Sequence, residues 1–168
     1  MLSTLLSLNY PPALSGLSFF FSTILHGLST NTQPAFYTMI LQRSLSSKKM
    51  RSSLFNYPQL TGCLVDFVRT SSSTQLQYQA LFCLWTLTFS NVMSNEFERR
   101  YGLTSILVQY IRSSHKEKII RICLSMIRNL LTKARRRVMP ILVGNKLIFI
   151  LDSISSKGYT DVEIIHDS

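Results

Sequence analysis

The sequence predicts an all-helical fold of repeated units, and two observations lead to that prediction. Three short stretches resemble one another: LVDFVR from Leu64, LVQYIR from Leu107 and LIFILD from Leu147. Their starts recur about every 40 residues, which is the spacing of armadillo and HEAT units. The first two copies are each followed by a long apolar pattern of helical period. We therefore expect an armadillo/HEAT-type right-handed superhelical repeat, an α solenoid, that is incomplete at its C-terminal end.

An apolar run lies near the N-terminus, over residues 13–28 (ALSGLSFFFSTILHGL). No Lys or Arg precedes it, no small-residue cleavage site follows it, and His26 interrupts a stretch that is short for a membrane span. We interpret it as a buried helix of the same domain and not as a signal peptide or membrane anchor.

The next region, between Leu45 and Tyr57, departs from the repeat plan. It should hold the long inner helix of its unit, but it holds a short stretch rich in Ser and Lys, with Lys48, Lys49 and Arg51. We therefore expect residues 1–57 to form a partial N-terminal repeat from which about one helix is missing.

Two long helices are predicted where a capping pair precedes an apolar run. Thr74 with Gln77 opens the first, and Ser114 with Glu117 opens the second. A helix that is apolar on most of its circumference must be packed between other elements, as the inner helix of a stacked repeat is. We expect the repeat core to be made by two stripes, one on each helix: Tyr78, Phe82, Trp85 and Phe89, and then Ile119, Ile122, Met126 and Leu130.

The best-defined unit has a short helix, a medium helix and a long inner helix, predicted over 92–99, 102–112 and 115–131. Residues 133–140 (KARRRVMP) are predicted to form a basic loop that Pro140 ends, where the next unit begins.

Taken together, residues 58–156 are expected to hold the armadillo-like repeats. Residues 157–168 contain Thr160 and Glu163 at the capping spacing, so we expect the start of a linker or of a further helix that is cut short.

The charge of the chain favours anionic partners, since the formal net charge is +10 at pH 7. The candidate partner contact is the run Lys133, Arg135, Arg136 and Arg137. It has no aromatic neighbours for base stacking, which disfavours nucleic acid. A solvated loop between units and a contact with an acidic protein face both remain as interpretations.

Motifs for catalysis or cofactor binding are absent from the sequence: it contains no GxxxxGK[ST], GxGxxG, HExxH or GxSxG. His26, His115 and His166 are far apart, and 8 acidic residues are a thin supply for acid–base chemistry. We predict no catalytic residue, no cofactor and no metal site.

The three cysteines, Cys63, Cys83 and Cys123, fit neither a zinc-binding spacing nor a closed disulfide framework. We expect ordinary thiols in a reducing compartment.

The stretch QLQYQALFCLWTLTFS (75–90) followed by KEKIIRICLSMIRNLL (116–131) resembles the H subunit of the vacuolar-type proton-pumping ATPase (V-type ATPase). That family has a QLQYQ-type start to an inner helix that contains a tryptophan, and then a KEK helix that ends in RNxL. The stretch 157–164 (KGYTDVEI) resembles the family's segment between its two domains. The resemblance is good over residues 75–165 and weaker over 15–45.

The resemblance implies a non-catalytic regulatory and structural subunit of the cytosolic V1 sector, with no nucleotide site of its own. It implies a role in ATP-driven proton transport and organelle acidification through binding of the peripheral stalk formed by the E and G subunits. Membrane association would be indirect, through the pump, on the cytosolic face of vacuolar or other acidic organelles. The family's C-terminal domain has no counterpart in this sequence, so the inhibitory role of that domain is not carried over.

The alternative is an armadillo-type protein-binding adaptor unrelated to the pump. Adaptors that bind basic targeting peptides carry a tryptophan followed four residues later by asparagine. In this chain the residue four positions after Trp85 is Phe89 and not asparagine. The net positive charge of the chain also disfavours binding of basic peptides. An RNA-binding repeat would need polar pairs that recur along one groove, and Gln79 and Arg121 do not form such a series.

Overall fold

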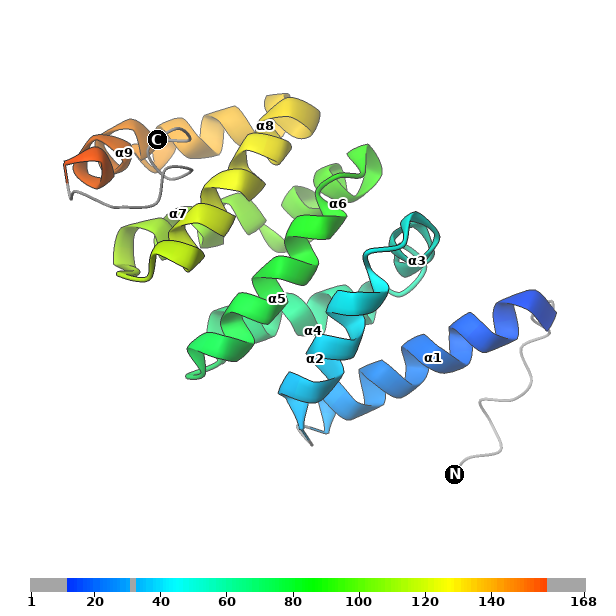
Figure 1. Ribbon diagram of the computed structural model, residues 1–168. Coiled ribbons are helices and arrows are strands. Elements are labelled where there is room, and N and C mark those ends of the chain that lie inside the picture. Colours follow the sequence, from blue (N-terminus) through cyan, green and yellow to red (C-terminus); the bar gives the residue numbers. More distant parts are fainter. Residues whose placement is uncertain (1–11, 31–32, 157–168) are drawn as a thin grey trace.

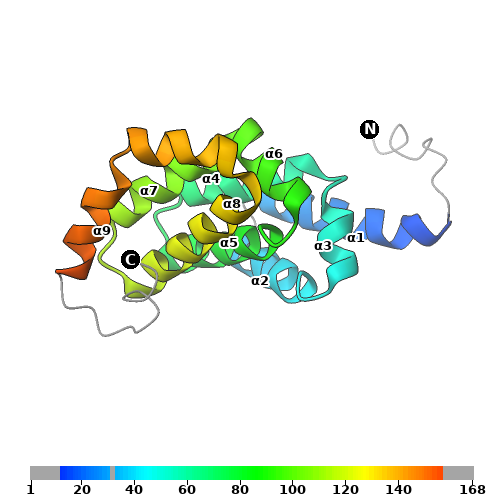
Figure 2. The ribbon, with the colours of Figure 1, turned by 90° about the horizontal axis from the view of Figure 1, so that it is seen from above.

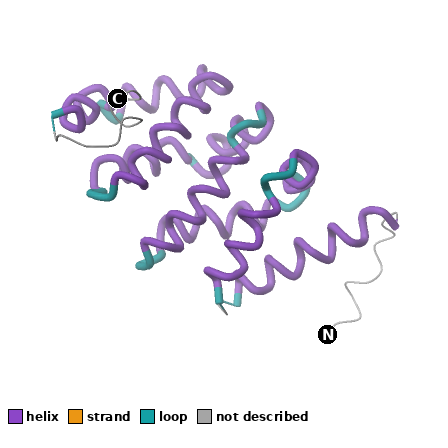
Figure 3. The backbone as a smooth tube through the Cα atoms, in the orientation of Figure 1, coloured by secondary structure: helices purple, strands orange, loops and turns teal. Residues whose placement is uncertain are grey.

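The computed structural model describes residues 12–30 and 33–156, and in this part of the chain the fold consists of helices without strands (Figure 1). The helices in chain order are α1 (Pro12–Ser29), α2 (Pro34–Ser44), α3 (Lys48–Leu54), α4 (Pro58–Thr70), α5 (Thr74–Leu87), α6 (Asn91–Tyr101), α7 (Leu103–Ser113), α8 (Glu117–Gly144) and α9 (Leu147–Ser155). Short connections join them (Figure 3), and successive helices stack along the chain. The predicted all-helical solenoid is confirmed.

Two layers of helices make up the stack. Helices α2, α5 and the first part of α8 lie side by side in one layer, and α1, α4 and α7 lie behind them (Figures 1 and 2). Each inner helix packs on the helix that precedes it in the same unit: α5 on α4, and α8 on α7. The core runs between the layers and includes Leu64, Leu84, Leu107 and Leu130, which are fully buried.

The repeated hexapeptides lie in α4, α7 and α9: the first two lie in the C-terminal part of their helices, and the third begins its helix. Arg69, at the end of the first copy, donates a hydrogen bond from Nη2 to the carbonyl of Tyr101 at 2.8 Å. Arg112, at the end of the second, donates to the carbonyl of Asn145 at 3.1 Å. In both cases the acceptor lies at the C-terminal end of a helix, where carbonyl groups lack helical partners. The sequence repeat is therefore also a repeat of contacts.

Helix α1 contains the apolar run near the N-terminus. Phe21, Ile24 and Leu28 are buried on one face, at helical spacing, while Phe19 is 76% exposed. The predicted helix is present, but it is buried on one side only. Within the described ranges, no helix has both the length and the apolarity that a membrane crossing requires.

The region between Leu45 and Tyr57 holds the short helix α3, and it is α2 that packs against α5. Leu41, Leu45 and Leu54 are fully buried at this junction. The expected loss of a helix from residues 1–57 stays a prediction.

The predicted capping residues are wrong by one position for α5 and by two for α8. Ser73, and not Thr74, caps α5: its hydroxyl accepts a hydrogen bond from the N–H of Leu76 at 3.3 Å. Ser73 has the extended backbone that a capping residue requires, and the serines at 71–73 offer several candidate caps that spacing alone does not separate. Helix α8 begins at Glu117, and Ser114 accepts from the N–H of Lys116 before the helix starts.

The predicted basic loop is also wrong, because residues 133–140 are helical. Helix α8 continues to Gly144 with a single non-helical residue, Ala134 (φ −130°, ψ 30°), at which the helix kinks. Val138 and Leu142 are buried one turn apart beyond the kink, so packing holds the second part of the helix against the core. Pro140 lies inside that part, where this packing outweighs its tendency to break a helix. The further helix start expected at Thr160 and Glu163 lies outside the described residues.

Candidate partner-binding surface

The basic run predicted as a partner contact lies at the kink of α8. We call Lys133, Arg135, Arg136 and Arg137 the basic cluster. Because the helix restarts after Ala134, the three arginines fall in a first helical turn, about 100° apart around the axis. All three arginines are exposed, and Lys133 is half-buried. A helix, and not the predicted loop, displays the basic cluster, and its role as a partner contact stays a prediction.

The basic cluster lines an open depression of about 550 Å³, together with Asn95, Thr132 and Ala134. The described residues that line it include no carboxylate. The depression is thus an electropositive surface suited to carboxylates of a partner.

Lys133 connects the basic cluster to a row of aromatic rings on α5. Its Nζ lies 5.8 Å from the centre of the Phe89 ring. We call Tyr78, Phe82, Trp85 and Phe89 the aromatic ladder. Successive ring centres are 6.5, 5.3 and 5.2 Å apart, and the last two pairs meet edge to face. Such stacking holds each ring in place against its neighbour.

The aromatic ladder corrects the predicted core on α5. Tyr78, Phe82 and Trp85 are only half-buried, and Phe89 is 52% exposed. The face of α5 that turns inward carries smaller side chains: Ala80, Leu81, Cys83, Leu84 and Leu87. Helix α5 packs against α2, α4 and α8, and small side chains permit close approach on those sides. The stripe predicted on α8, Ile119, Ile122, Met126 and Leu130, lies in the buried core.

A groove of about 190 Å³ runs between α5 and α8 beside the aromatic ladder. Its walls are Tyr78, Phe82 and Trp85 from α5, and Lys118, Arg121, Ile122 and Ser125 from α8. We call it the α5–α8 groove. The sequence pattern does not predict it, because that pattern places the aromatic residues in the core. One feature of the sequence could have predicted the groove. Helix α5 is apolar on nearly every side, and its neighbours cannot cover all of these sides, so one apolar face stays at the surface.

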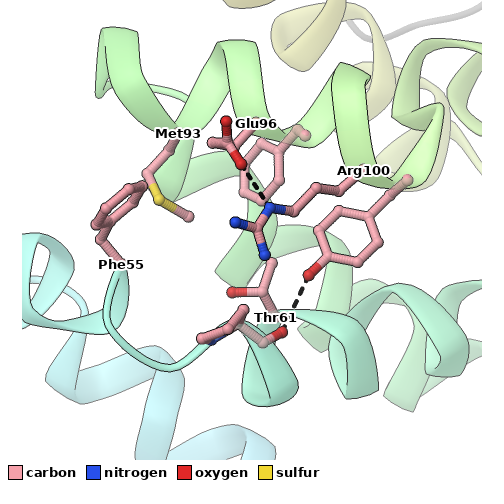
Figure 4. A pocket seen from close by; sticks show the side chains of 8 residues that line it. Phe55, Thr61, Met93, Glu96 and Arg100 are labelled. Carbon is pink, nitrogen blue, oxygen red and sulfur yellow. Dashed lines mark hydrogen bonds and ion pairs between the residues drawn. The ribbon is translucent and has the colours of Figure 1, made fainter.

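A second, much smaller cavity lies between α3, α4 and α6 (Figure 4). Phe55, Thr61, Met93, Glu96 and Arg100 line it, and its volume is about 20 Å³. This volume has room for one water molecule and not for an organic ligand. The hydroxyl of Thr61 is buried there without a hydrogen-bond partner in the described part of the chain, which fits a site for an ordered water.

The three cysteines are free thiols. Cys83 and Cys123 are buried, and the loss of solvent raises the pKa of each thiol far above its ordinary range. Burial, and then the negative charge of Asp66, raises the pKa of the half-buried Cys63. Since the thiolate is the reactive form, these cysteines are poor nucleophiles and poor metal ligands at neutral pH.

Comparison with known proteins places the chain in a family. The family of the V-ATPase H subunit matches it over residues 2–168. The chain belongs to the V-ATPase H-subunit family. This membership favours the pump-subunit hypothesis over the adaptor alternative.

Individual members of the V-ATPase H-subunit family are similar to the chain over part of their length. The first of two probable V-type proton ATPase H subunits from Caenorhabditis elegans is 32% identical over 102 residues, which cover 55% of this chain and 22% of that protein. The Drosophila melanogaster V-type proton ATPase H subunit is 36% identical over 70 residues, covering 42% of this chain and 15% of that protein. The Dictyostelium discoideum protein of the same name is 27% identical over 161 residues, covering 93% of this chain and 36% of that protein. The chain thus spans about a third or less of these relatives.

Proposed function

We propose that the chain is a non-catalytic accessory subunit of the V1 sector that supports ATP-driven proton transport by binding stator subunits. Membership of the V-ATPase H-subunit family and the helical solenoid support this role. Solenoids present extended surfaces to partner proteins, and such a subunit needs no active site of its own. It would lie on the cytosolic face of an acidic organelle and reach the membrane only through the pump.

The observation that carries the proposal further is the exposed basic cluster at the kink of α8. We propose that this cluster contacts the E–G peripheral stalk. Arg135, Arg136 and Arg137 are exposed, lie in one helical turn, and share a depression without carboxylates among its described lining residues. Complementary charge would speed the encounter with an acidic stretch of the stalk and fix its orientation.

The test measures binding of the chain to a purified E–G heterodimer. One variant combines Arg135→Glu, Arg136→Glu and Arg137→Glu. A matched control combines Arg43→Glu, Lys48→Glu and Lys49→Glu, which reverses the same number of exposed charges on α2 and α3. We expect the cluster variant to bind the stalk about tenfold or more weakly than the control, since several interfacial charges become repulsive.

Equal binding by the two variants would contradict the assignment of the basic cluster. Retention of RNA by the wild-type chain, with no binding to the stalk, would contradict the proposed function itself. Circular dichroism melts of both variants establish that each is folded.

A second assay addresses the role in transport. Vesicles from cells that lack their own V-ATPase H protein, supplied with the chain, are tested for ATP-driven acidification. Acidification above the level of vesicles without added chain is expected, and the cluster variant should reduce it more than the control variant does.

A further inference from the structure

We propose that the α5–α8 groove binds an acidic amphipathic helix of a partner protein, at a surface that adjoins the basic cluster and shares Lys133 with it. The aromatic ladder would receive the apolar face of that helix. Lys118 and Lys133 would pair with carboxylates near the two ends of the ladder.

The first step of the argument is the exposure of the aromatic ladder. Tyr78, Phe82 and Trp85 lie at i, i+4 and i+7 on one face of α5, and Phe89 follows two residues after the helix ends. The first three rings are half-buried, and Phe89 is 52% exposed. Water contact with such a row is unfavourable, and contiguous apolar patches on a surface mark interaction sites. The inner halves of Tyr78, Phe82 and Trp85 pack against the core, so these rings are held in place before a partner arrives.

The second step is the shape of the surface. From Tyr78 to Trp85 the ladder extends about 10 Å along α5, or roughly two helical turns, and Phe89 continues it beyond the end of the helix. Ile122 and Ser125 of α8 form the opposite wall, so two neighbouring helices flank one groove. A third helix fits along such a groove with side chains at i, i+4, i+7 and i+11, in the same spacing as the ladder.

The third step is charge. The polar groups of the α5–α8 groove include Lys118, which is exposed, and Arg121, which is half-buried. Its described lining residues include no carboxylate. At the other end of the ladder, Lys133 lies against Phe89. A helix that carries carboxylates beside its apolar stripe complements this pattern, whereas a basic helix would meet like charges.

The chain carries its own reporter for a test, because Trp85 is its only tryptophan and lines the groove. The probe is a synthetic helix-forming peptide of Leu and Glu with its leucines on one face. We expect a saturable shift of Trp85 emission to shorter wavelength as the peptide excludes water from the ring. A peptide with Lys at every Glu position, and a scrambled peptide of the same composition, should produce no saturable shift.

Two variants change exposed positions, where a substitution leaves the core intact: Lys118 lines the groove, and Phe89 is the last ring of the aromatic ladder. Phe89→Ser and Lys118→Glu should each weaken binding of the acidic peptide by about tenfold, as loss of an interface anchor does. Phe19→Ser removes a similar exposed ring from α1 and should bind the peptide as the wild type does. Both groove variants should still bind the E–G stalk, which separates this proposal from the proposed function.

Four results would overturn the proposal. The first is an equal shift with the acidic and basic peptides, and the second is wild-type affinity in both groove variants. The third is a shift of Trp85 emission with protein concentration alone, since a second copy of the chain would then occupy the groove. The fourth is a shift of Trp85 emission to longer wavelength in a variant that combines Ile164→Ser and Ile165→Ser, since a segment of the chain itself would then be the occupant.

Discussion

Asn129 in α8 donates a hydrogen bond from its side-chain amide to the hydroxyl of Thr88, at 2.9 Å. Thr88 immediately follows α5 and is fully buried. Its hydroxyl donates in turn to the carbonyl of Trp85, and its own carbonyl accepts from the hydroxyl of Ser94 in α6. One buried threonine therefore joins two inner helices and the short helix between them.

Asn129→Ala should lower the free energy of unfolding by about 1 kcal/mol, because it removes one partly buried hydrogen bond between helices. Urea denaturation measures the change. Asn95→Ala is the matched control, since the exposed Asn95 bonds to Asn91 within its own helix, and it should change stability by less than about 0.5 kcal/mol. Equal effects of the two substitutions would show that the contact to Thr88 contributes no more than a local bond.

Two glycines in α1 should respond in opposite directions to the same substitution. A Cβ atom on Gly27 would lie 2.2 Å from the ring of Tyr37 in α2, so Gly27→Ala should destabilise the fold by about 1–3 kcal/mol. A Cβ on Gly16 meets nothing within 4 Å, so Gly16→Ala should stabilise α1 by roughly 0.5–1 kcal/mol. Thermal melts compare the two variants. A melting temperature that rises for Gly27→Ala would mean that α1 and α2 are not packed this closely.

The buried thiols should make stability fall at high pH. The folded state keeps Cys83 and Cys123 protonated because burial raises the pKa of each, whereas the unfolded chain releases these protons from about pH 9 upward. The folded state then binds more protons, so its stability decreases as pH rises beyond that value. Urea melts over this range should show a smaller decrease for Cys83→Ala than for the wild type.

Labelling with a thiol reagent at neutral pH checks the same burial. Cys63 should react first, and Cys83 and Cys123 only when urea unfolds the chain. Rapid labelling of all three cysteines in the folded protein would contradict the burial of Cys83 and Cys123.

The carboxyl of Glu96 in α6 should remain ionised in acid. Hydrogen bonds from Arg99, and then from Arg100, lower its pKa to about 2 (Figure 4 shows the contact with Arg100). The stability that this contributes is present above about pH 4.5, the value of an unperturbed carboxyl, and is lost as pH falls toward 2. Because the pair is at the surface, added salt should reduce the effect.

A nuclear magnetic resonance titration of the Glu96 side chain measures that pKa directly. Glu96→Gln should flatten the dependence of stability on pH between 4.5 and 2. An ordinary titration midpoint for Glu96 would show that the two arginine contacts are not maintained in solution.

The sequence predicts the helices well where an apolar stripe and its neighbours agree. The predicted helix over 102–112 is α7 (Leu103–Ser113), and the first two hexapeptides predict that α4 and α7 make corresponding contacts, through Arg69 and Arg112. Helix α7 has a single apolar stripe, so only one orientation of the helix places that stripe against the core. Helix α5 is different, because it has two apolar stripes and the period of the pattern does not say which one the neighbouring helices cover. Ring size favours an inward place for Tyr78 and Phe89, but the smaller side chains permit the closer packing and take it.

The candidate site is predictable in its charges and not in its backbone. Arg135, Arg136 and Arg137 are consecutive cations, and their exposure follows from the cost of burying a charge. The loop predicted around them comes from the rule that proline ends a helix. Val138 and Leu142 supply packing beyond the kink. This packing involves α6 and α7, so the local sequence alone does not predict it.

The kink at Ala134 has a mechanical meaning. One residue, and not a flexible loop, separates the inner helix of one unit from the first helix of the next, so the angle between them is set by a single pair of torsion angles. A load applied to the second part of α8 would pass through Ala134 alone to the first part, which packs against α5. If the chain holds stator subunits as proposed above, stiffness of this kind would help it to resist torque.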